Sequence, residues 1–461
     1  MEKRIERDFT TGPIAKPMFT FTVPIFLANM LVMMYALVDT LIVGRYMGTT
    51  GISAVTVGSQ FMHLLTLVGV GFANGGQVVI ARMKGIGSEK AQRESIGTLT
   101  TISFALGLIF SLIGVVMVNP ALQLLNTPAE AFQDAKEYMF WTSLSMVFHF
   151  IFSSNSAVLR GLGDSKRPLV FISIATILNV ILDILFVGPL HMRAAGAAIA
   201  TSLSIATSAV CSTVYLYLKR KNFVFDFKLA SFIPRKYCVK ELARMGIPQV
   251  IQSAAIQISM SVVMAMINVY GADASATLGV GNRIIHLFIM PATAFSAAAG
   301  SMSAQNIGAN KIDRARKIIL SAFGLGMIFT VIGAVVMAVF PEQIVGIFDD
   351  SPEVIRLGSI FLRIHIVHNF ALSTLQVFCA AALGVGNAIL GSVGLLVDGV
   401  VLRLALSFLF RALGFGLIGF FWASSIAPVG AAVIFVAYYL SNGWVRYHEK
   451  HMNRLQEAKQ E

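Results

Sequence analysis

The sequence predicts an all-α polytopic membrane protein, with twelve transmembrane helices arranged as two parallel six-helix repeats. Composition is the first of three observations that lead to this fold class. Of the 461 residues, 56% are hydrophobic and only 13% are charged, and the mean hydropathy is +0.76. The apolar runs reach the roughly 20 residues that a helix needs to cross a bilayer. Strands of a membrane barrel would be shorter and would alternate in polarity, so a barrel is not expected.

Twelve apolar runs can be separated along the chain. We expect helices centred on residues 18–44, 52–80, 95–118, 135–159, 168–187, 195–218, 247–269, 276–303, 316–340, 354–383, 388–410 and 417–441.

The positions of the basic residues are the second observation. The net charge is +12, but 27 of the 35 Lys and Arg residues lie in the two terminal tails and in the loops after the second, fourth, sixth and eighth runs. The intervening loops hold almost none. This alternation follows the positive-inside rule, so we expect a multi-pass protein of the cell membrane with both termini in the cytoplasm. It argues against a nucleic-acid-binding role for the positive charge.

An internal repeat is the third observation. At an offset of 223, GTTGISAVTVGSQFMHLL at 48–65 aligns with GADASATLGVGNRIIHLF at 271–288, RGLGD with LGVGN, and GAAIATS with GFFWASS. Each match is weak alone, but several separate stretches share one register. Six helices restore the original orientation, so the halves should be parallel repeats related by an axis along the membrane normal.

The repeat divides the chain into two lobes. We expect an N-lobe over residues 1–218, a basic cytoplasmic linker over 219–244, and a C-lobe with a cytoplasmic tail over 245–461. The linker has room for a short surface helix.

Charged residues inside the apolar runs are the main functional signal, because an Asp at the centre of a membrane helix costs about 2.5 to 3.5 kcal/mol on insertion scales. Asp39 lies five residues before Gly44 and Asp183 five before Gly188, while Thr201 lies five after Gly196. With the alternating directions of their helices, all three should lie about 7.5 Å inside the outer surface.

Asn179 precedes Asp183 by one helical turn, so an amide oxygen should join this layer. Hard oxygen ligands of this kind suit a proton or a small cation such as Na⁺. Two neighbouring carboxylates away from water do not both stay ionised, so at least one should hold a proton near neutral pH.

The repeat confines this polar layer to the first half of the chain. At an offset of 223, Asp39 corresponds to Val262 and Asp183 to Leu406, and Asn179 to Leu402, while Thr201 keeps a hydroxyl at Ser424. Packing alone would preserve small residues in both halves. A pair of acids in one half only points to function, against the alternative that the two acids are merely paired with donors in the bundle.

Other polar residues of the apolar runs are weaker candidates. Asp398 and Arg403 are five residues apart, about 140° around an α-helix, so we do not expect them to pair directly. His149, His365 and His368 lack the acids of a metal motif and are expected to be satisfied polar residues. Pro24 removes a backbone donor and should kink the first helix below Asp39.

Four motifs resemble the MATE (multidrug and toxic compound extrusion) family: VDTLIVGRYMG, VLRGLGDSKRP, NVILD and GAAIATS. The resemblance covers nearly the whole chain and implies a secondary antiporter that exports amphipathic, often cationic compounds in exchange for H⁺ or Na⁺ by alternating access of two lobes. Carried over, the cation-coupling set of the prokaryotic branch falls on Asp39, Asn179, Asp183 and Thr201, with Tyr35 and a hinge at Pro24 beside it.

A second branch of the family couples through acids in the seventh and tenth helices, and here the sequence departs from that pattern. It has Gln252 and Gln257 in the seventh helix and no acid within the tenth beyond Glu353 at its start. We therefore expect coupling in the N-lobe. Tyr35, Asn155, Gln252, Gln257 and Asp398 are the candidates for the wall of the substrate cavity.

The remaining expectations are mostly absences. No nucleophile motif, P-loop or metal motif appears, so we expect a transporter that is not an enzyme, uses no cofactor and holds no metal beyond a possible Na⁺. A monomer embedded in lipid that binds small amphipathic molecules is expected. The alternative is a flippase for lipid-linked or polysaccharide precursors on the same architecture, and a channel fits the one-sided acids less well.

Overall fold

The computed structural model describes residues 7–220 and 223–457, with side chains to residue 450, and over these residues it is helical without strands. Ten of the described helices are long and apolar enough to cross a membrane. This confirms the predicted fold class. The helices are α1 (Ala15–Ile86), α2 (Glu89–Leu124), α3 (Ala129–Leu144), α4 (Met146–Gly161), α5 (Lys166–Val187), α6 (Arg193–Leu218), η2 (Leu229–Phe232), α7 (Lys236–Asn268), α8 (Ala272–Gly308), α9 (Ile312–Val339), α10 (Pro341–Gly346), α11 (Pro352–Gly384), α12 (Ala388–Leu396), η3 (Val397–Leu402), α13 (Arg403–Ala412), α14 (Gly416–Leu440) and α15 (Gly443–Glu457).

The predicted runs and the observed helices differ in how they are joined. The first two runs follow each other within α1, where Gly48 alone leaves the helical conformation with φ 65° and ψ −154°. The run 135–159 is split at Ser145 into α3 and α4. The run 388–410 contains a π-helical turn, η3. The sequence did not predict α15, because this helix is amphipathic and too polar to resemble a membrane span.

The chain folds into two compact units. The first contains Val23–Val250 and the described residues before Phe9, and the second contains Phe9–Thr22 and Ile251–Glu461. The two units therefore divide within α7, at Val250, and the beginning of α1 belongs to the second unit.

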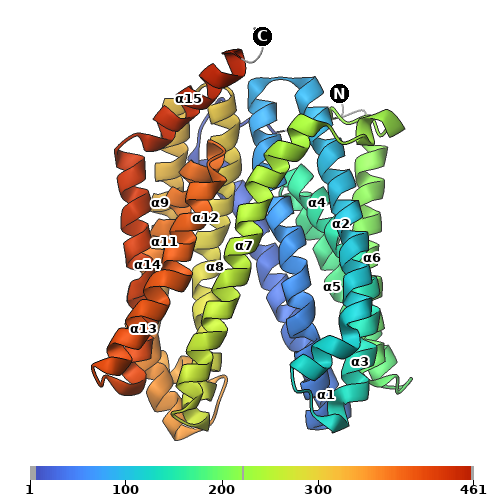
Figure 1. Cartoon of the computed structure of the whole chain (residues 1–461), viewed down its shortest axis with the longest axis vertical. Coiled ribbons are helices and arrows are strands. Elements are labelled where there is room, and N and C mark those ends of the chain that lie inside the picture. Colours follow the sequence, from blue (N-terminus) through green and yellow to red (C-terminus); the bar gives the residue numbers. More distant parts are fainter. Residues whose placement is uncertain (1–6, 221–222, 458–461) are drawn as a thin grey trace. The chain divides into compact units, whose positions relative to one another are not determined.

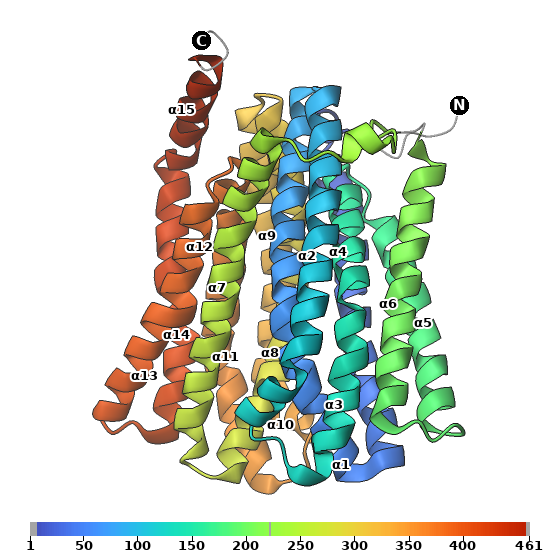
Figure 2. The same ribbon diagram turned by 45° about the vertical axis from the view of Figure 1, so that its right-hand side comes forward.

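The first unit is built around α4. This helix packs against α2 on one side and α6 on the other, and α5 lies along α6 (Figures 1 and 2). Small residues allow close approaches to α4: a side chain on Gly107 of α2 would press against the Val147 backbone, and one on Gly161 of α4 against the Gln77 carbonyl of α1. The predicted linker lies on α2, where the Thr101 hydroxyl donates to the Phe232 carbonyl at 2.6 Å.

The second unit is built around α11, which packs against α8, α9 and α14 (Figure 1). Its apolar core contains Ile284, Met337, Phe361 and Phe421, all at most 1% exposed. Membrane helices do not associate through a hydrophobic effect in lipid, so this tight packing and the hydrogen bonds within it hold the unit together.

The N-terminal arm, Phe9–Thr22, is packed within the second unit. The Phe9 amide donates to Gln305 Oε1 at 2.6 Å, the Arg314 side chain donates to the Phe9 and Thr11 carbonyls, and the Phe9 ring meets Phe21 edge to face. The corresponding start of α7 belongs instead to the first unit, where Glu241 pairs with Arg82 at 2.7 Å. The beginning of each half is thus packed on the unit formed by the other half.

The repeat is visible in the backbone itself. Ten residues with positive φ angles form five pairs that follow the predicted offset of 223. The pairs are Gly48 and Gly271, Gly87 and Asn310, Gly163 and Gly386, His191 and Gly414, and Arg193 and Gly416. The repeat therefore extends to the backbone conformation of these five positions in both halves.

Candidate functional site

The predicted cation-coupling residues come together in the first unit. Asp39 on α1 and Asp183 on α5 are 6% and 0% exposed, and their carboxyl groups are close enough to share a hydrogen bond once one of them carries a proton. Asn179, one turn before Asp183, lies beside the same carboxyl group. The α5 residues face inward because Asn179 and Asp183 continue the buried stripe of that helix.

Thr201 on α6 and Tyr35 on α1 complete this cluster. The Asn179 amide donates to Thr201 Oγ1 at 3.4 Å, and the Tyr35 hydroxyl lies 3.3 Å from the same oxygen. Tyr35 is one turn before Asp39, so α1 presents both side chains on one face. Three helices therefore contribute to one polar cluster, which we call the acidic cluster: Tyr35, Asp39, Asn179, Asp183 and Thr201.

The acidic cluster has more acceptors than donors. Among the described residues, Asp39 Oδ1, Asn179 Oδ1 and both carboxyl oxygens of Asp183 are buried without a hydrogen-bond partner. Unpaired buried acceptors are costly, and a bound proton or small cation would satisfy several of them together. The arrangement is thus suited to reversible cation binding.

Tyr138 on α3 was missed by the sequence analysis. It is 5% exposed, and its hydroxyl is close enough to Tyr35, Asp39 and Asp183 to interact electrostatically with all three. Its ring lies on Gly58, where any side chain would overlap it. A tyrosine in an apolar helix carries no signal of its own, but its repeat partner Phe361 lies on Gly281 in the same way, and comparing the two would have shown the extra hydroxyl.

The corresponding positions in the second unit are apolar. Val262 on α7 is 37% exposed, and Leu402 and Leu406 replace Asn179 and Asp183. Only Ser424 retains a hydroxyl. The acidic cluster thus has no equivalent in the other half.

The predicted cavity residues are placed differently from one another. Asn155 on α4 is buried, and its amide donates to the hydroxyls of Ser212 and Thr213 on α6. Gln252 is half-buried and Gln257 exposed, both on α7. Their role in a substrate cavity stays a prediction.

Pro24 lies buried inside α1, where the missing amide leaves a gap in the helical hydrogen bonds. The change from the second unit to the first occurs between Thr22 and Val23, immediately before this proline. The hinge role of Pro24 stays a prediction, but the residue is located where the helix passes from one unit to the other.

Asp398 and Arg403 do pair, so the expectation that they lie on different faces was wrong. Arg403 Nη2 lies 3.7 Å from Asp398 Oδ1, and the side chains are 11% and 6% exposed. The cause is the π-helical turn η3, in which hydrogen bonds join residues five apart and bring positions 398 and 403 to one face. The expected separation around the axis assumed an uninterrupted α-helix.

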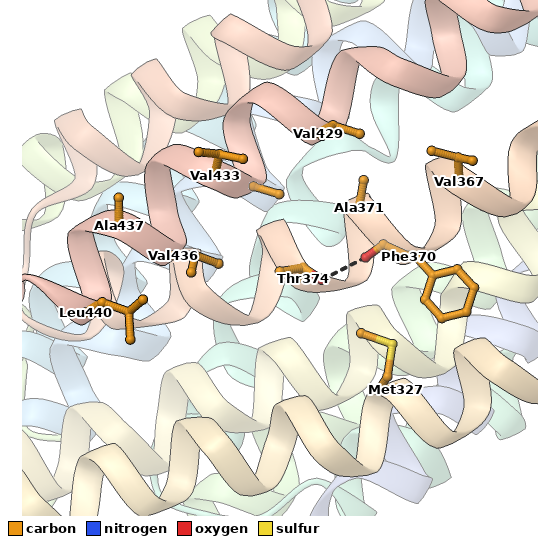
Figure 3. A pocket seen from close by; sticks show the side chains of 11 residues that line it. Met327, Val367, Phe370, Ala371, Thr374, Val429, Val433, Val436, Ala437 and Leu440 are labelled. Carbon is orange, nitrogen blue, oxygen red and sulfur yellow. Dashed lines mark hydrogen bonds between the residues drawn. The ribbon is translucent and has the colours of Figure 1, made fainter.

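An apolar groove of about 610 Å³ lies along the second unit between α9, α11 and α14 (Figure 3). Its walls include Met327, Val367, Phe370 and Val433, and its one hydroxyl, on Thr374, donates to the Phe370 carbonyl. Such a surface suits hydrocarbon and offers nothing to an ion.

A family model described as MatE matches the chain twice, over residues 24–185 and 248–409. The chain belongs to the MatE family. The two matches fall in the two halves of the repeat, so each half of this MatE transporter carries the family pattern.

Two relatives and one solved structure illustrate the similarity of this MatE protein to others. A "Probable multidrug resistance protein YoeA" of Bacillus subtilis is 27% identical over 81% of this chain and 82% of its own length. The "Probable multidrug resistance protein NorM" of Thermotoga maritima is 25% identical over 94% and 93%. An outward-facing MATE family transporter of the MOP superfamily covers 97% of this chain and 100% of its own, with a TM-score of 0.90 at 19% identity, which supports the fold alone.

Proposed function

We propose that this MatE protein is a multidrug efflux antiporter that exports amphipathic, often cationic compounds in exchange for H⁺ or Na⁺. The efflux part rests on relatives that are named multidrug resistance proteins. The coupling part rests on one observation: two buried carboxyl groups, Asp39 and Asp183, meet inside membrane helices with unpartnered oxygens.

Exchange follows from the charge of the acidic cluster. With both carboxylates ionised, the cluster attracts a cationic compound and is costly to bury. When a proton or Na⁺ binds, the charge is reduced and the attraction for the cationic compound falls. The two ligands therefore lower each other's affinity, and this reciprocal coupling is what an antiporter requires. Alternating access then moves one ligand inward and the other outward, with α1 bending at Pro24 as the element that responds to the change in charge.

Transport in proteoliposomes tests this proposal. Asp39→Asn and Asp183→Asn should each abolish efflux of ethidium driven by a pH or Na⁺ gradient, since an amide neither releases a proton nor supplies a charge. Asp273→Asn, which changes an exposed acid at the start of α8, is the matched control and should transport normally. Full gradient-driven efflux by both cluster variants would rule the proposal out. Running each gradient separately distinguishes H⁺ from Na⁺.

A further inference from the structure

The second unit contains a polar cluster of its own, which the coupling mechanism does not use. Asp398 and Arg403 lie near the middle of the 25-residue span Ala388–Ala412. His365 and His368 lie on the adjacent part of α11, both buried, with their rings 5.5 Å apart, and Arg403 is close enough to interact electrostatically with both imidazoles. We call these four residues the arginine cluster. Ionisable groups at this depth are costly and usually mark a site.

The ion pair in the arginine cluster is loose. The 3.7 Å between Arg403 Nη2 and Asp398 Oδ1 exceeds the length of a hydrogen bond. Among the described residues, Asp398 Oδ1 and Arg403 Nε are buried without a hydrogen-bond partner. A guanidinium offers five donors in a planar fork that fits an oxyanion with two parallel hydrogen bonds. Asp398 does not supply that match in this arrangement.

The π-helical turn explains why the cluster exists at this place. A turn with bonds between residues five apart is rare and is frequently found at functional sites. Here it has one clear consequence, which is to bring the side chains of residues 398 and 403 to the same buried face. Gly399, within the turn, lets this segment pack directly on Ile256 of α7.

The two histidines restrict what else the cluster can bind. Nδ1 of His365 lies 2.9 Å from the Phe361 carbonyl and Nδ1 of His368 lies 3.1 Å from the Ser424 carbonyl. A carbonyl only accepts, so both Nδ1 atoms donate, and in the neutral ring Nε2 is left as an acceptor. The cluster therefore combines one donor fork with acceptors for hydroxyl or amine groups.

The two polar clusters differ in charge. The acidic cluster holds two carboxyl groups and no cationic side chain, whereas the arginine cluster pairs one carboxyl group with one permanent cation. The repeat partners of Asp398 and Arg403 are Ala175 and Val180. This ion pair, like the pair of acids in the acidic cluster, is therefore present in one half only. The arginine cluster therefore does not favour binding of a free cation, but it does favour binding of a negatively charged oxygen group.

We propose that the arginine cluster binds a carboxylate or phosphate group of the transported compound. Arg403 contacts that group directly, and the group displaces Asp398 from its place beside Arg403. The inference rests on the proposed export function and deepens it: zwitterionic and anionic amphiphiles join the cations as substrates. In this arrangement Asp398 keeps Arg403 neutralised while no substrate is bound, and His365 and His368 accept from donors on the ligand.

Two dyes that differ at one group provide the test. Rhodamine 110 has a free carboxylate, and rhodamine 123 is its methyl ester. Fluorescence anisotropy of each dye with the purified full-length protein in detergent measures binding without an ion gradient. Failure of the coupling proposal would therefore leave this result untouched, and failure of this proposal would leave coupling untouched.

Each variant has an expected direction of change in its affinity for the two dyes. Arg403→Gln should weaken binding of rhodamine 110 by about tenfold or more, the value of a charge-assisted hydrogen bond, and should alter binding of rhodamine 123 less than about twofold. Asp398→Asn should tighten rhodamine 110 binding, because the competing carboxylate is gone. Arg411→Gln, which changes an exposed arginine at the end of α13, should affect neither dye.

Three outcomes would overturn the proposal. These are no detectable binding of rhodamine 110 to the wild-type protein, equal losses for both dyes in Arg403→Gln, or weaker rhodamine 110 binding in Asp398→Asn. Arg403→Lys covers the case in which Arg403→Gln fails to fold. It keeps the charge and lacks the fork, so it should lose rhodamine 110 affinity selectively and by a smaller factor.

Discussion

Gly48 and Gly271, which correspond to each other in the internal repeat, break the helical conformation in the same way, with φ 65° and ψ −154° at the first and φ 103° and ψ 178° at the second. Both angles lie in a region that is essentially restricted to glycine. Gly48 joins the first and second membrane helices of its half within α1, and Gly271 ends the short turn between α7 and α8. The repeat therefore extends to the conformation of individual backbone positions.

Replacing either glycine by alanine should destabilise the protein by about 1 to 3 kcal/mol, the usual cost of holding a side chain in such a conformation. No atom lies within 4 Å of a Cβ built at either position, so the effect should come from the backbone alone. Thermal unfolding in detergent measures it. Gly324→Ala is the matched control, because its site is equally open but helical, and it should be neutral or slightly stabilising. Equal melting temperatures for all three variants would contradict this explanation.

Tyr138→Phe should separate packing from function in the acidic cluster. Phe361 lies on Gly281 as Tyr138 lies on Gly58, so the ring alone satisfies the packing and the melting temperature should stay unchanged. Loss of the hydroxyl, which interacts electrostatically with Asp39 and Asp183, should reduce gradient-driven efflux by about threefold to tenfold, or about 0.6 to 1.4 kcal/mol.

Tyr138→Ala provides the contrast, because it also removes the ring. The free energy of unfolding of this variant should be lower than that of the wild-type protein by about 3 to 5 kcal/mol. Wild-type efflux by Tyr138→Phe, at matched protein levels in the liposomes, would show that the hydroxyl plays no part in coupling.

The linker should respond to acid through Asp226. The Ser231 hydroxyl donates to Asp226 Oδ1 at 2.6 Å, the Lys228 amide donates at 3.2 Å, and Arg93 lies 3.6 Å away. These contacts hold the pKa of Asp226 below its usual range. A lowered pKa in the folded state gives stability that is present above the unfolded value of about 3.9 and is lost as pH falls through the folded value.

Hydrogen exchange over residues 223–235, corrected for the intrinsic pH dependence of exchange, measures this effect. Protection should fall below about pH 4. Asp226→Asn should remove the pH dependence, and Ser231→Ala should weaken it, because the serine hydroxyl is the largest contribution. A transition of the same size in Asp226→Asn would assign the effect to another group.

The sequence predicted the membrane helices and the acidic cluster because both leave a direct signal in residue type and spacing. Asp39 and Asp183 stand out against apolar neighbours, and their equal distance from the outer glycines follows from the regular rise of a helix. The repeat then showed that they lack partners in the second half. Helix geometry and the internal repeat were therefore sufficient to predict these two features.

Three features could not be predicted, for separate physical reasons. The pairing of Asp398 with Arg403 depends on a π-helical turn, which no residue in VDGVVL specifies and which shifts every later side chain around the axis. The position of Tyr138 near the two acids depends on tertiary packing. The change of unit at Thr22 depends on contacts between segments far apart in the chain, such as Phe9 with Gln305.

The buried pair Arg82 and Glu241 gives a final test of the repeat, because uncharged residues occupy the corresponding positions in the second half. The two side chains are 7% exposed and 2.7 Å apart, and the residues related to them by the repeat are Gln305 and Met18, which are also buried. Arg82→Gln or Glu241→Met alone should cost about 3 to 5 kcal/mol, because each removes the 2.7 Å contact from a charge that stays buried.

The double variant Arg82→Gln with Glu241→Met copies the second half and should recover most of that loss, since removing both members of a buried ion pair is often neutral. Thermal unfolding of the four proteins gives the coupling energy directly. Additive losses in the double variant would show that the two halves are not interchangeable at this position. Recovery would show that the charges stabilise the fold only as a pair.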